Sequence, residues 1–234
     1  DDLNSLIDQT EKLIQTAVTG DEIGAYSAEK KKELEKSLEA ARGVSRDKET
    51  SQIKVDDTAV VLSSGMKNFE ASRKSGTVSM TPMISNAVGW KAKNANYIRV
   101  SGNTLTFHPA NGDMVAGYEE ILPSYPVWSF KAKFDLTANW QAFGLRASDA
   151  TSVGWSSAAS YMIIIKQDQI ELQRFYLGGK TLQIIPNTLI QSGIEHKIEI
   201  GSVDMEGGVN IIFKVDGVTD RKSTRLNSSH RCIS

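Results

Sequence analysis

The side chains best suited to chemistry in this chain are aromatic and planar polar residues in its C-terminal half. A sugar ring stacks its apolar face on Trp or Tyr and pairs its hydroxyls with Arg, Glu or Gln, so a glycan groove needs both kinds of side chain close together. Residues of these types gather between positions 140 and 174. The candidate ligand-binding residues are Trp140, Arg146, Trp155, Tyr161, Glu171, Gln173 and Arg174.

Strand alternation predicts which of these residues share a side. In a strand that begins at Trp140, the even-numbered residues through Arg146 lie on one face, and Gly144 leaves an open spot beside Arg146. Trp155 lies in a loop of small residues, 154–160, that is suited to border a site. Because an exposed Trp without a core role is unfavourable, we expect both tryptophans to face a ligand.

The other candidates belong to a β-hairpin over residues 161–176. Glu171 and Gln173 alternate with apolar residues in its second arm and form a polar face, whereas the first arm is apolar on both faces, as in a strand covered above and below. A structural interpretation stays open for the rest of the set. Tyr161 could be a buried strand-end residue, and Arg146 and Arg174 could pair with nearby carboxylates on a solvated face.

The usual catalytic arrangements are missing from the sequence. Glycoside hydrolysis on a strand needs two carboxylates one residue apart, because alternate residues share a face and retention requires about 5–5.5 Å between the carboxyl groups. Glu119 and Glu120 are adjacent and face opposite sides, and Glu171 has no acidic partner at 169 or 173. His108 and His196 are too isolated to predict a metal centre. We therefore expect no enzymatic activity in this chain, with a glycoside hydrolase or lyase domain as the lesser alternative.

The charge distribution narrows the range of partners. Residues 1–75 carry 12 basic and 15 acidic side chains, and residues 76–219 carry 11 and 12, so no folded part has the basic excess of a nucleic-acid-binding protein. No apolar run approaches the ~18 residues of a membrane-spanning helix. No cofactor is expected, although Asp204, Glu206 and Asp216 leave a structural calcium ion open.

Residues 1–74 show the periodicity of three amphipathic helices. Apolar residues return every three or four positions, and Gly20 and Gly43 end the first two stretches. Ser27 can cap the second helix. The apolar residues from Val55 to Phe69 step by four, three, four and three, which is the spacing of an antiparallel bundle. The pattern predicts an all-α three-helix bundle.

Beyond residue 76 the period of the apolar residues falls from about 3.6 to two. A polar linker at 72–76 separates the two patterns, and turns with Gly, Asn, Pro or Asp divide most of the second pattern into short strands. Strands with such short connections predict an all-β antiparallel sandwich over residues 77–219. The ten candidate strands are residues 97–100, 104–108, 114–120, 127–136, 141–147, 161–166, 170–176, 182–185, 196–203 and 210–216.

Residues 1–72 resemble the FIVAR repeat. The shared features are a Gly and an aromatic residue before a Leu- and Ala-rich helix, a short break, and a third helix that opens with Thr50-x-Gln52 and Val55-Asp56. The family more often has an acidic residue where this chain has Ile53 after Gln52. The resemblance implies a three-helix spacer of exported or wall-associated bacterial proteins, often joined to polysaccharide lyases, glycoside hydrolases or carbohydrate-binding modules.

Residues 77–217 resemble concanavalin A-like jelly rolls, which include laminin G-like and carbohydrate-binding modules. The matching pieces are, in order, WSFKAKFDL, FGLRASD, SYMIIIKQDQIELQRF, HKIEIGSV and NIIFKVDG. They contain a Gly-x-Arg strand, a Tyr-led hairpin with Arg near the end of its second arm, a His-x-Ile-x-Ile strand and a closing Val-Asp-Gly hairpin. The resemblance implies a curved sheet whose concave face binds sugar in some members, and proteins or nothing known in others.

The last fifteen residues, 220–234, are expected to be non-native. Eleven consecutive residues, 220–230, resemble the translation of a sequencing-library adapter. The one cysteine, Cys232, lies in this tail, and the tail carries four basic residues and one acidic residue, so the rest of the chain has a formal charge of −4. Because the chain starts with Asp rather than Met, we expect a metagenomic fragment whose sandwich could lack its last strand.

Together these features favour a non-catalytic carbohydrate-binding module with a helical spacer. We expect it to come from a modular bacterial protein that is secreted or attached to the cell wall and processes polysaccharides. The alternative is a structural or adhesive module that contacts another protein and no glycan. The expected partner is a polysaccharide or glycan, with no nucleic acid and no membrane insertion, and the module is expected to be monomeric within a larger chain.

Overall fold

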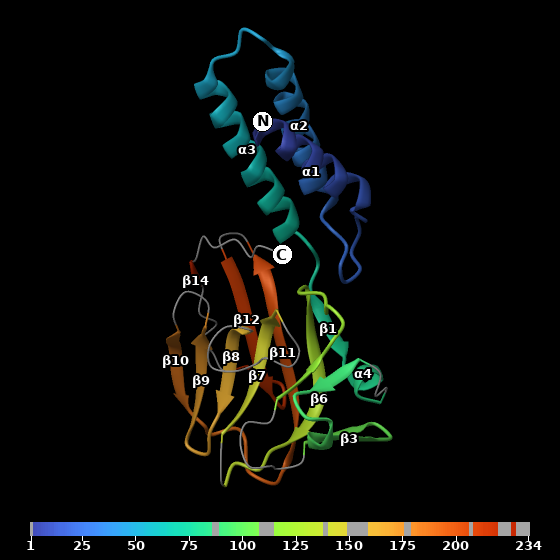
Figure 1. Cartoon of the computed structure of the whole chain (residues 1–234), viewed down its shortest axis with the longest axis vertical. Coiled ribbons are helices and arrows are strands. Elements are labelled where there is room, and N and C mark those ends of the chain that lie inside the picture. Colours follow the sequence, from blue (N-terminus) through green and yellow to red (C-terminus); the bar gives the residue numbers. More distant parts are fainter. Residues whose placement is uncertain are drawn as a thin grey trace. The chain divides into compact units, whose positions relative to one another are not determined.

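A computed structural model describes residues 2–85, 89–107, 115–137, 140–148, 159–175, 179–205, 208–219 and 226–227. The chain divides into two compact units, one of Asp1–Gly76 with Val203–Asn210 and Thr224–Ser234, and the other of Thr77–Ser202 and Ile211–Ser223. Figure 1 shows the long helices first in the chain, in blue and teal, and the strands after them, in green to red. The predicted order of helices followed by antiparallel sheets is confirmed.

Three helices make up most of the first unit: α1 (Asp2–Thr16), α2 (Ala28–Arg46) and α3 (Gln52–Ala71). Ser27 and Ser51 cap α2 and α3, because each hydroxyl accepts a hydrogen bond from the backbone N–H three residues further on. All three helices pack against one another around one apolar core. Its buried residues are Leu3, Ile7, Tyr26, Leu34, Leu38, Ala41, Leu62 and Phe69.

The segment between α1 and α2 is fastened to the end of α3. Tyr26 stacks on Phe69 with 4.5 Å between the ring centroids, and the guanidinium of Arg73 lies 4.3 Å from the Tyr26 centroid. The backbone N–H of Lys74 donates to the carbonyl of Ala25 at 2.7 Å. The first part of the predicted linker is therefore ordered against the helices.

The second unit begins with short elements and continues with longer strands. The short elements are β1 (Gly76–Ser79), α4 (Thr81–Ser85), β2 (Trp90–Ala92), the 3-10 helix η1 (Ala95–Tyr97), β3 (Ile98–Ser101), β4 (Thr104–Phe107) and β5 (Ala116–Tyr118). The later strands are β6 (Pro126–Lys133), β7 (Gln141–Ala147), β8 (Ala159–Ile165), β9 (Gln169–Arg174), β10 (Lys180–Pro186), β11 (Glu195–Met205), β12 (Gly208–Val215), β13 (Val218–Thr219) and β14 (Leu226–Asn227). Each of the ten predicted strands overlaps one of these, whereas alternation did not predict β1, β2, β13 or β14.

The later strands form two sheets. One has the order β1-β6-β11-β12-β13, with β14 also paired to β12, and the other is the meander β10-β9-β8-β7. Figure 1 shows the four strands of the meander side by side. The pairings β6–β11, β7–β8, β8–β9, β9–β10 and β12–β13 are antiparallel. Two small ribbons, β2–β5 and β3–β4, complete the described pairings.

The inner faces of the two large sheets share one apolar core. Ile165 of β8 lies in the same buried cluster as Ile198 of β11 and Val215 of β12. Phe143 of β7 meets Phe130 of β6 edge to face, with 5.4 Å between the ring centroids. Because alternate residues of a strand face opposite sides, the intervening residues point outward and form the surfaces available to a ligand.

Candidate ligand-binding surface

The polar face predicted for the hairpin lies on the outward side of the four-stranded sheet. On β8 and β9, the residues of one parity pack into the shared core. The residues of the other parity pair with one another across the two strands. Glu171 lies opposite Ile164, and Gln173 lies opposite Met162. These four side chains therefore share the outward face.

Glu171 is a buried carboxylate that three side chains hold in place. Its exposed fraction is 5%, and the ammonium of Lys166 donates to its Oε1. The Nε2 of Gln169 donates to the same oxygen at 2.5 Å, and the Nε2 of Gln173 donates to Oε2 at 2.6 Å. The hydrogen bond from Lys166, helped by the two amides, lowers the pKa of Glu171 although burial opposes it. The group is therefore charged at neutral pH.

The charge on Glu171 determines how the two glutamine amides are oriented. A carboxylate only accepts hydrogen bonds, so each amide must turn its NH₂ group toward Glu171. The carbonyl oxygen and the second N–H of each amide then point elsewhere in a fixed orientation. Gln169 and Gln173 are four residues apart on β9, which separates their Cα atoms by roughly 13 Å. Each of the two amides on β9 thus presents one acceptor oxygen and one N–H donor in a fixed direction.

The part of this face that β8 forms is closed. Met162 and Ile164 are 7% and 2% exposed, and they pack with Phe175 in a second buried cluster. On β10, by contrast, Ile184 lies opposite Glu171 and is 56% exposed. The predicted hollow is therefore not open over β8, and the accessible parts of the face lie on β9 and β10 and, at the exposed Gly144, on β7.

Arg146 does not follow the predicted alternation. Its φ of 54° is a left-handed conformation that interrupts the regular backbone of β7. Its Nε donates to the hydroxyl of Ser202 at 3.1 Å, and an Nη donates to the Ser202 carbonyl at 3.4 Å. Because Ser202 belongs to β11, the Arg146 side chain reaches the other large sheet and does not join Glu171 and Gln173.

Of the remaining candidates, Tyr161 and Arg174 alternate with Met162 and Gln173 on their strands and so do not share the face of Glu171 and Gln173. Tyr161 lies opposite Arg174 across β8 and β9, and it is 2% exposed, as the structural interpretation expects. Trp140 precedes β7 and is 37% exposed. Trp155 lies outside the described residues. Of the seven candidates, only Glu171 and Gln173 are brought together by a hydrogen bond that the structure describes.

Sequence reasoning missed two members of this cluster, Lys166 and Gln169. Gln169 was assigned to the turn, yet it begins β9 and shares the face of Glu171 because it lies two residues before it. Lys166 lies on the opposite side of the same tight turn. The period-two spacing of Gln169, Glu171 and Gln173 was the available signal.

A second polar pair, between the buried His196 and the exposed Asp216, lies at the start of β11. His196 is 6% exposed, and its Nδ1 lies 2.7 Å from Oδ2 of Asp216. The backbone N–H of Gln191 donates to Nε2 at 3.1 Å, so Nδ1 carries the proton that His196 donates to Asp216. This bond lowers the pKa of Asp216. With both ring nitrogens engaged, His196 has no lone pair for general-base catalysis, and the pair joins β11 to the end of β12.

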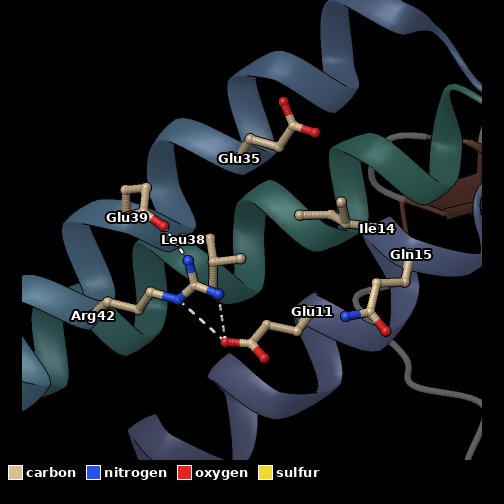
Figure 2. Close-up of a pocket in the computed structure, with 7 residues that line it drawn as sticks. All are labelled: Glu11, Ile14, Gln15, Glu35, Leu38, Glu39 and Arg42. Atoms are coloured by element: carbon tan, nitrogen blue, oxygen red, sulfur yellow. Dashed lines mark hydrogen bonds and ion pairs between the residues drawn. The ribbon is translucent and has the colours of Figure 1, made fainter.

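A shallow hollow of about 210 Å³ lies between α1 and α2 (Figure 2). Arg42 of α2 donates from Nε and an Nη, at 3.1 and 2.8 Å, to Oε1 of Glu11 on α1, and it also pairs with Glu39. The hydrogen bonds that Arg42 donates to Glu11 and Glu39 raise the pKa of Arg42. Figure 2 shows Leu38 and Ile14 beside this ion pair. The hollow is thus the site of a contact that joins two helices.

Among the described residues, no three His, Cys, Asp or Glu side chains gather to hold a metal ion, and Glu206 lies outside these residues. No helix in the described ranges is long and apolar enough to cross a membrane. In comparisons with known proteins, no family model matches the chain, and no curated protein or solved structure matches it either. Function must therefore be inferred from the surface itself.

Proposed function

We propose that the second unit is a non-catalytic carbohydrate-binding module, a jelly roll of the concanavalin A-like kind, and that the first unit is a FIVAR-like spacer. Two sheets around one core support the jelly roll, and three mutually packed helices support the spacer. In this proposal the chain belongs to a larger secreted or cell-surface bacterial protein that processes polysaccharides.

The oriented amides of Gln169 and Gln173 are the observation that carries this proposal. Each sugar hydroxyl both donates and accepts, so a fixed amide can pair with two neighbouring hydroxyls, one through its oxygen and one through its N–H. Because Glu171 orients the amides before a ligand arrives, less conformational entropy is lost on binding. The exposed Ile184 beside them supplies apolar surface for the face of a sugar ring.

A structural or adhesive module is the second candidate. The burial of Met162 and Ile164 favours it, because these residues close the part of the face where an open groove was expected. This candidate predicts that the chain retains no glycan and that its contacts are with another protein.

A glycan array probed with the full chain tests the proposal. Gln169→Met and Gln173→Met keep the side-chain length and remove the amide, and each should weaken binding roughly 2- to 12-fold, the equivalent of one hydrogen bond of about 0.5–1.5 kcal/mol. Gln15→Met on the exposed side of α1 is the matched control and should bind like the parent. Glycan binding that neither sheet variant weakens contradicts the proposed site, and a chain that binds no glycan favours the adhesive module.

A further inference from the structure

The outward side of the six-stranded sheet carries a concentration of lysines. On β6 and β11 the residues of one parity pack in the shared core, as Phe130 and Ile198 do, so the intervening residues face outward. On β12 the buried Val215 likewise turns Lys214 outward. We call this surface the lysine face. It consists of Lys131, Lys133, Glu195, Lys197, Glu199 and Lys214.

Like charges lie opposite each other on the lysine face. Lys131 and Lys197 are direct partners in the antiparallel register of β6 and β11, an arrangement that destabilises a sheet unless other charges compensate. Glu195 offsets part of this repulsion through an ion pair with Lys131 at 2.8 Å. Four ammonium groups face the carboxylates of Glu195 and Glu199. Asp216, which is 53% exposed and accepts from the backbone N–H of Lys197, adds a third carboxylate beside them, so the surface keeps a small excess of positive charge.

Glu199 holds two of the lysines in position. Its side chain is only 11% exposed, and its two oxygens pair with Lys197 at 2.9 Å and with Lys214 at 3.4 Å. The hydrogen bond from Lys197 lowers the pKa of Glu199 although burial opposes it. The side chains of Lys131 and Lys197 nevertheless remain 74% and 54% exposed. The fold thus positions these ammonium groups and leaves them accessible to an anionic ligand.

We propose that the lysine face binds a linear acidic polysaccharide, a polymer that carries both carboxylates and free hydroxyls. The ammonium groups pair with the carboxylates of the ligand, and the oxygens of the exposed Glu195 accept hydrogen bonds from its hydroxyls. A nucleic acid fits this surface less well, because its phosphates are acceptors only and the two glutamates repel them. Residues 76–219 also carry 11 basic against 12 acidic side chains, so no long-range positive field favours a densely charged polyanion.

This site is separate from the two glutamines, which lie on the other large sheet. Binding of an acidic polymer to the lysine face requires no contact at Gln169 or Gln173. The inference therefore goes beyond the proposed function and can hold or fail independently of it.

Affinity electrophoresis of the full chain through gels containing polygalacturonate tests the inference. We expect retardation at about 50 mM salt that largely disappears at about 0.5 M. Lys131→Glu combined with Lys197→Glu should weaken binding at least about tenfold, or ~1.4 kcal/mol. Lys131→Gln with Lys197→Gln removes the two charges without adding acidic groups and should weaken binding about threefold. This variant keeps the test valid if charge reversal disturbs folding.

The matched control makes the same change of charge elsewhere. Lys32→Glu with Lys36→Glu alters two exposed lysines of α2, and it should bind within about twofold of the parent. The inference is overturned if polygalacturonate does not retard the parent at low salt, if the lysine-face variants bind like the parent, or if the α2 control loses as much affinity. Tighter binding of a short duplex DNA than of polygalacturonate also overturns it. A neutral glucan distinguishes the two sites. If it retards the chain, and if Gln173→Met but not the lysine-face variants abolishes that retardation, the binding belongs to the glutamine site.

Discussion

Replacing Glu171 by Gln removes the charge at the centre of the polar cluster on β9 and keeps the shape of the side chain. In the native protein, Lys166, Gln169 and Gln173 all donate to the two carboxylate oxygens. In Glu171→Gln one oxygen becomes an NH₂ group, and the glutamine amide that faces it must turn its oxygen inward to accept. All three hydrogen bonds then lose their charged acceptor at a position that is 5% exposed.

The size of the effect follows from the charge that the hydrogen bonds lose. A hydrogen bond to a charged group contributes ~1.5–3 kcal/mol, and a neutral one about 0.5–1.5 kcal/mol. Lys166 is 36% exposed and regains water when the carboxylate is lost, so the loss of charge in the two glutamine bonds dominates. We expect Glu171→Gln to lower the free energy of unfolding by ~2 kcal/mol and the Tm of the second unit by about 4–8 °C.

Thermal unfolding of the full chain, followed by the β-sheet signal in circular dichroism, measures this loss. Glu119→Gln is the matched control, because it breaks an ion pair on the surface. Glu119 is 52% exposed, and its partner Lys91 is 56% exposed. Its effect should stay below about 0.5 kcal/mol, as for most exposed pairs. A Tm of Glu171→Gln that matches the control would refute the structural role assigned to the buried carboxylate.

The pH dependence gives a second test of the same variant. The hydrogen bond from Lys166 lowers the pKa of Glu171 in the folded chain, so its stabilising contribution is present above the unfolded pKa of about 4.3. That contribution is lost as the pH falls through the lower folded value. The Tm difference between the native chain and Glu171→Gln should therefore narrow in acid, and a difference that persists near pH ~2 would contradict the assignment.

Three further substitutions test other parts of the fold. Asp216→Asn replaces the charged acceptor of His196 with a neutral amide oxygen; because the bond from His196 lowers the pKa of Asp216, the resulting Tm difference from the native chain should narrow as the pH falls below about 3.9. Arg42→Met breaks the partly exposed ion pair with Glu11 and should lower the free energy of unfolding of the helical unit in urea by about 0.5–1 kcal/mol. Arg42→Lys should recover only part of this loss, because an ammonium cannot reproduce the geometry of the guanidinium. Phe69→Ala empties a fully buried position at a cost of ~3–5 kcal/mol, and an unchanged midpoint of the helical circular dichroism signal would contradict its place in the core.

Periodicity located the helices and strands because it reports which side of an element is buried. The apolar spacing from Val55 to Phe69 predicted one face of a helix, and that face packs in the core of the helical unit. The pair Asp216-Gly217 is a comparable local signal. Both residues have positive φ, 52° and 79°, as in the tight turn that joins two strands of a hairpin. Such features depend on neighbouring residues only, so a single sequence is enough to predict them.

Alternation fails as a guide to the candidate site where the backbone leaves the extended region. Counting from Trp140 places Arg146 beside Gly144, but the φ of 54° at Arg146 accompanies a side chain that bonds to Ser202 on the other sheet. A non-glycine residue adopts this conformation at some cost, and a tertiary contact maintains it. The residues predicted to surround Glu171 did not include Lys166 for a related reason. Lys166 contacts Glu171 across a turn, and alternation along one strand does not reveal such a contact.

The composition of β8 limits where a ligand can meet the four-stranded sheet. Its residues are apolar on both faces, a pattern typical of a strand that is covered on both sides, and Met162 and Ile164 are buried accordingly. The apolar pattern that predicted β8 therefore also argues against an open polar groove over this strand. On the neighbouring β9, Gln169 and Gln173 are only half-buried, and Ile184 on β10 is exposed. A glycan that binds through the two amides must therefore lie over β9 and β10, and in the proposed site we expect its affinity to depend on the amides that Glu171 orients.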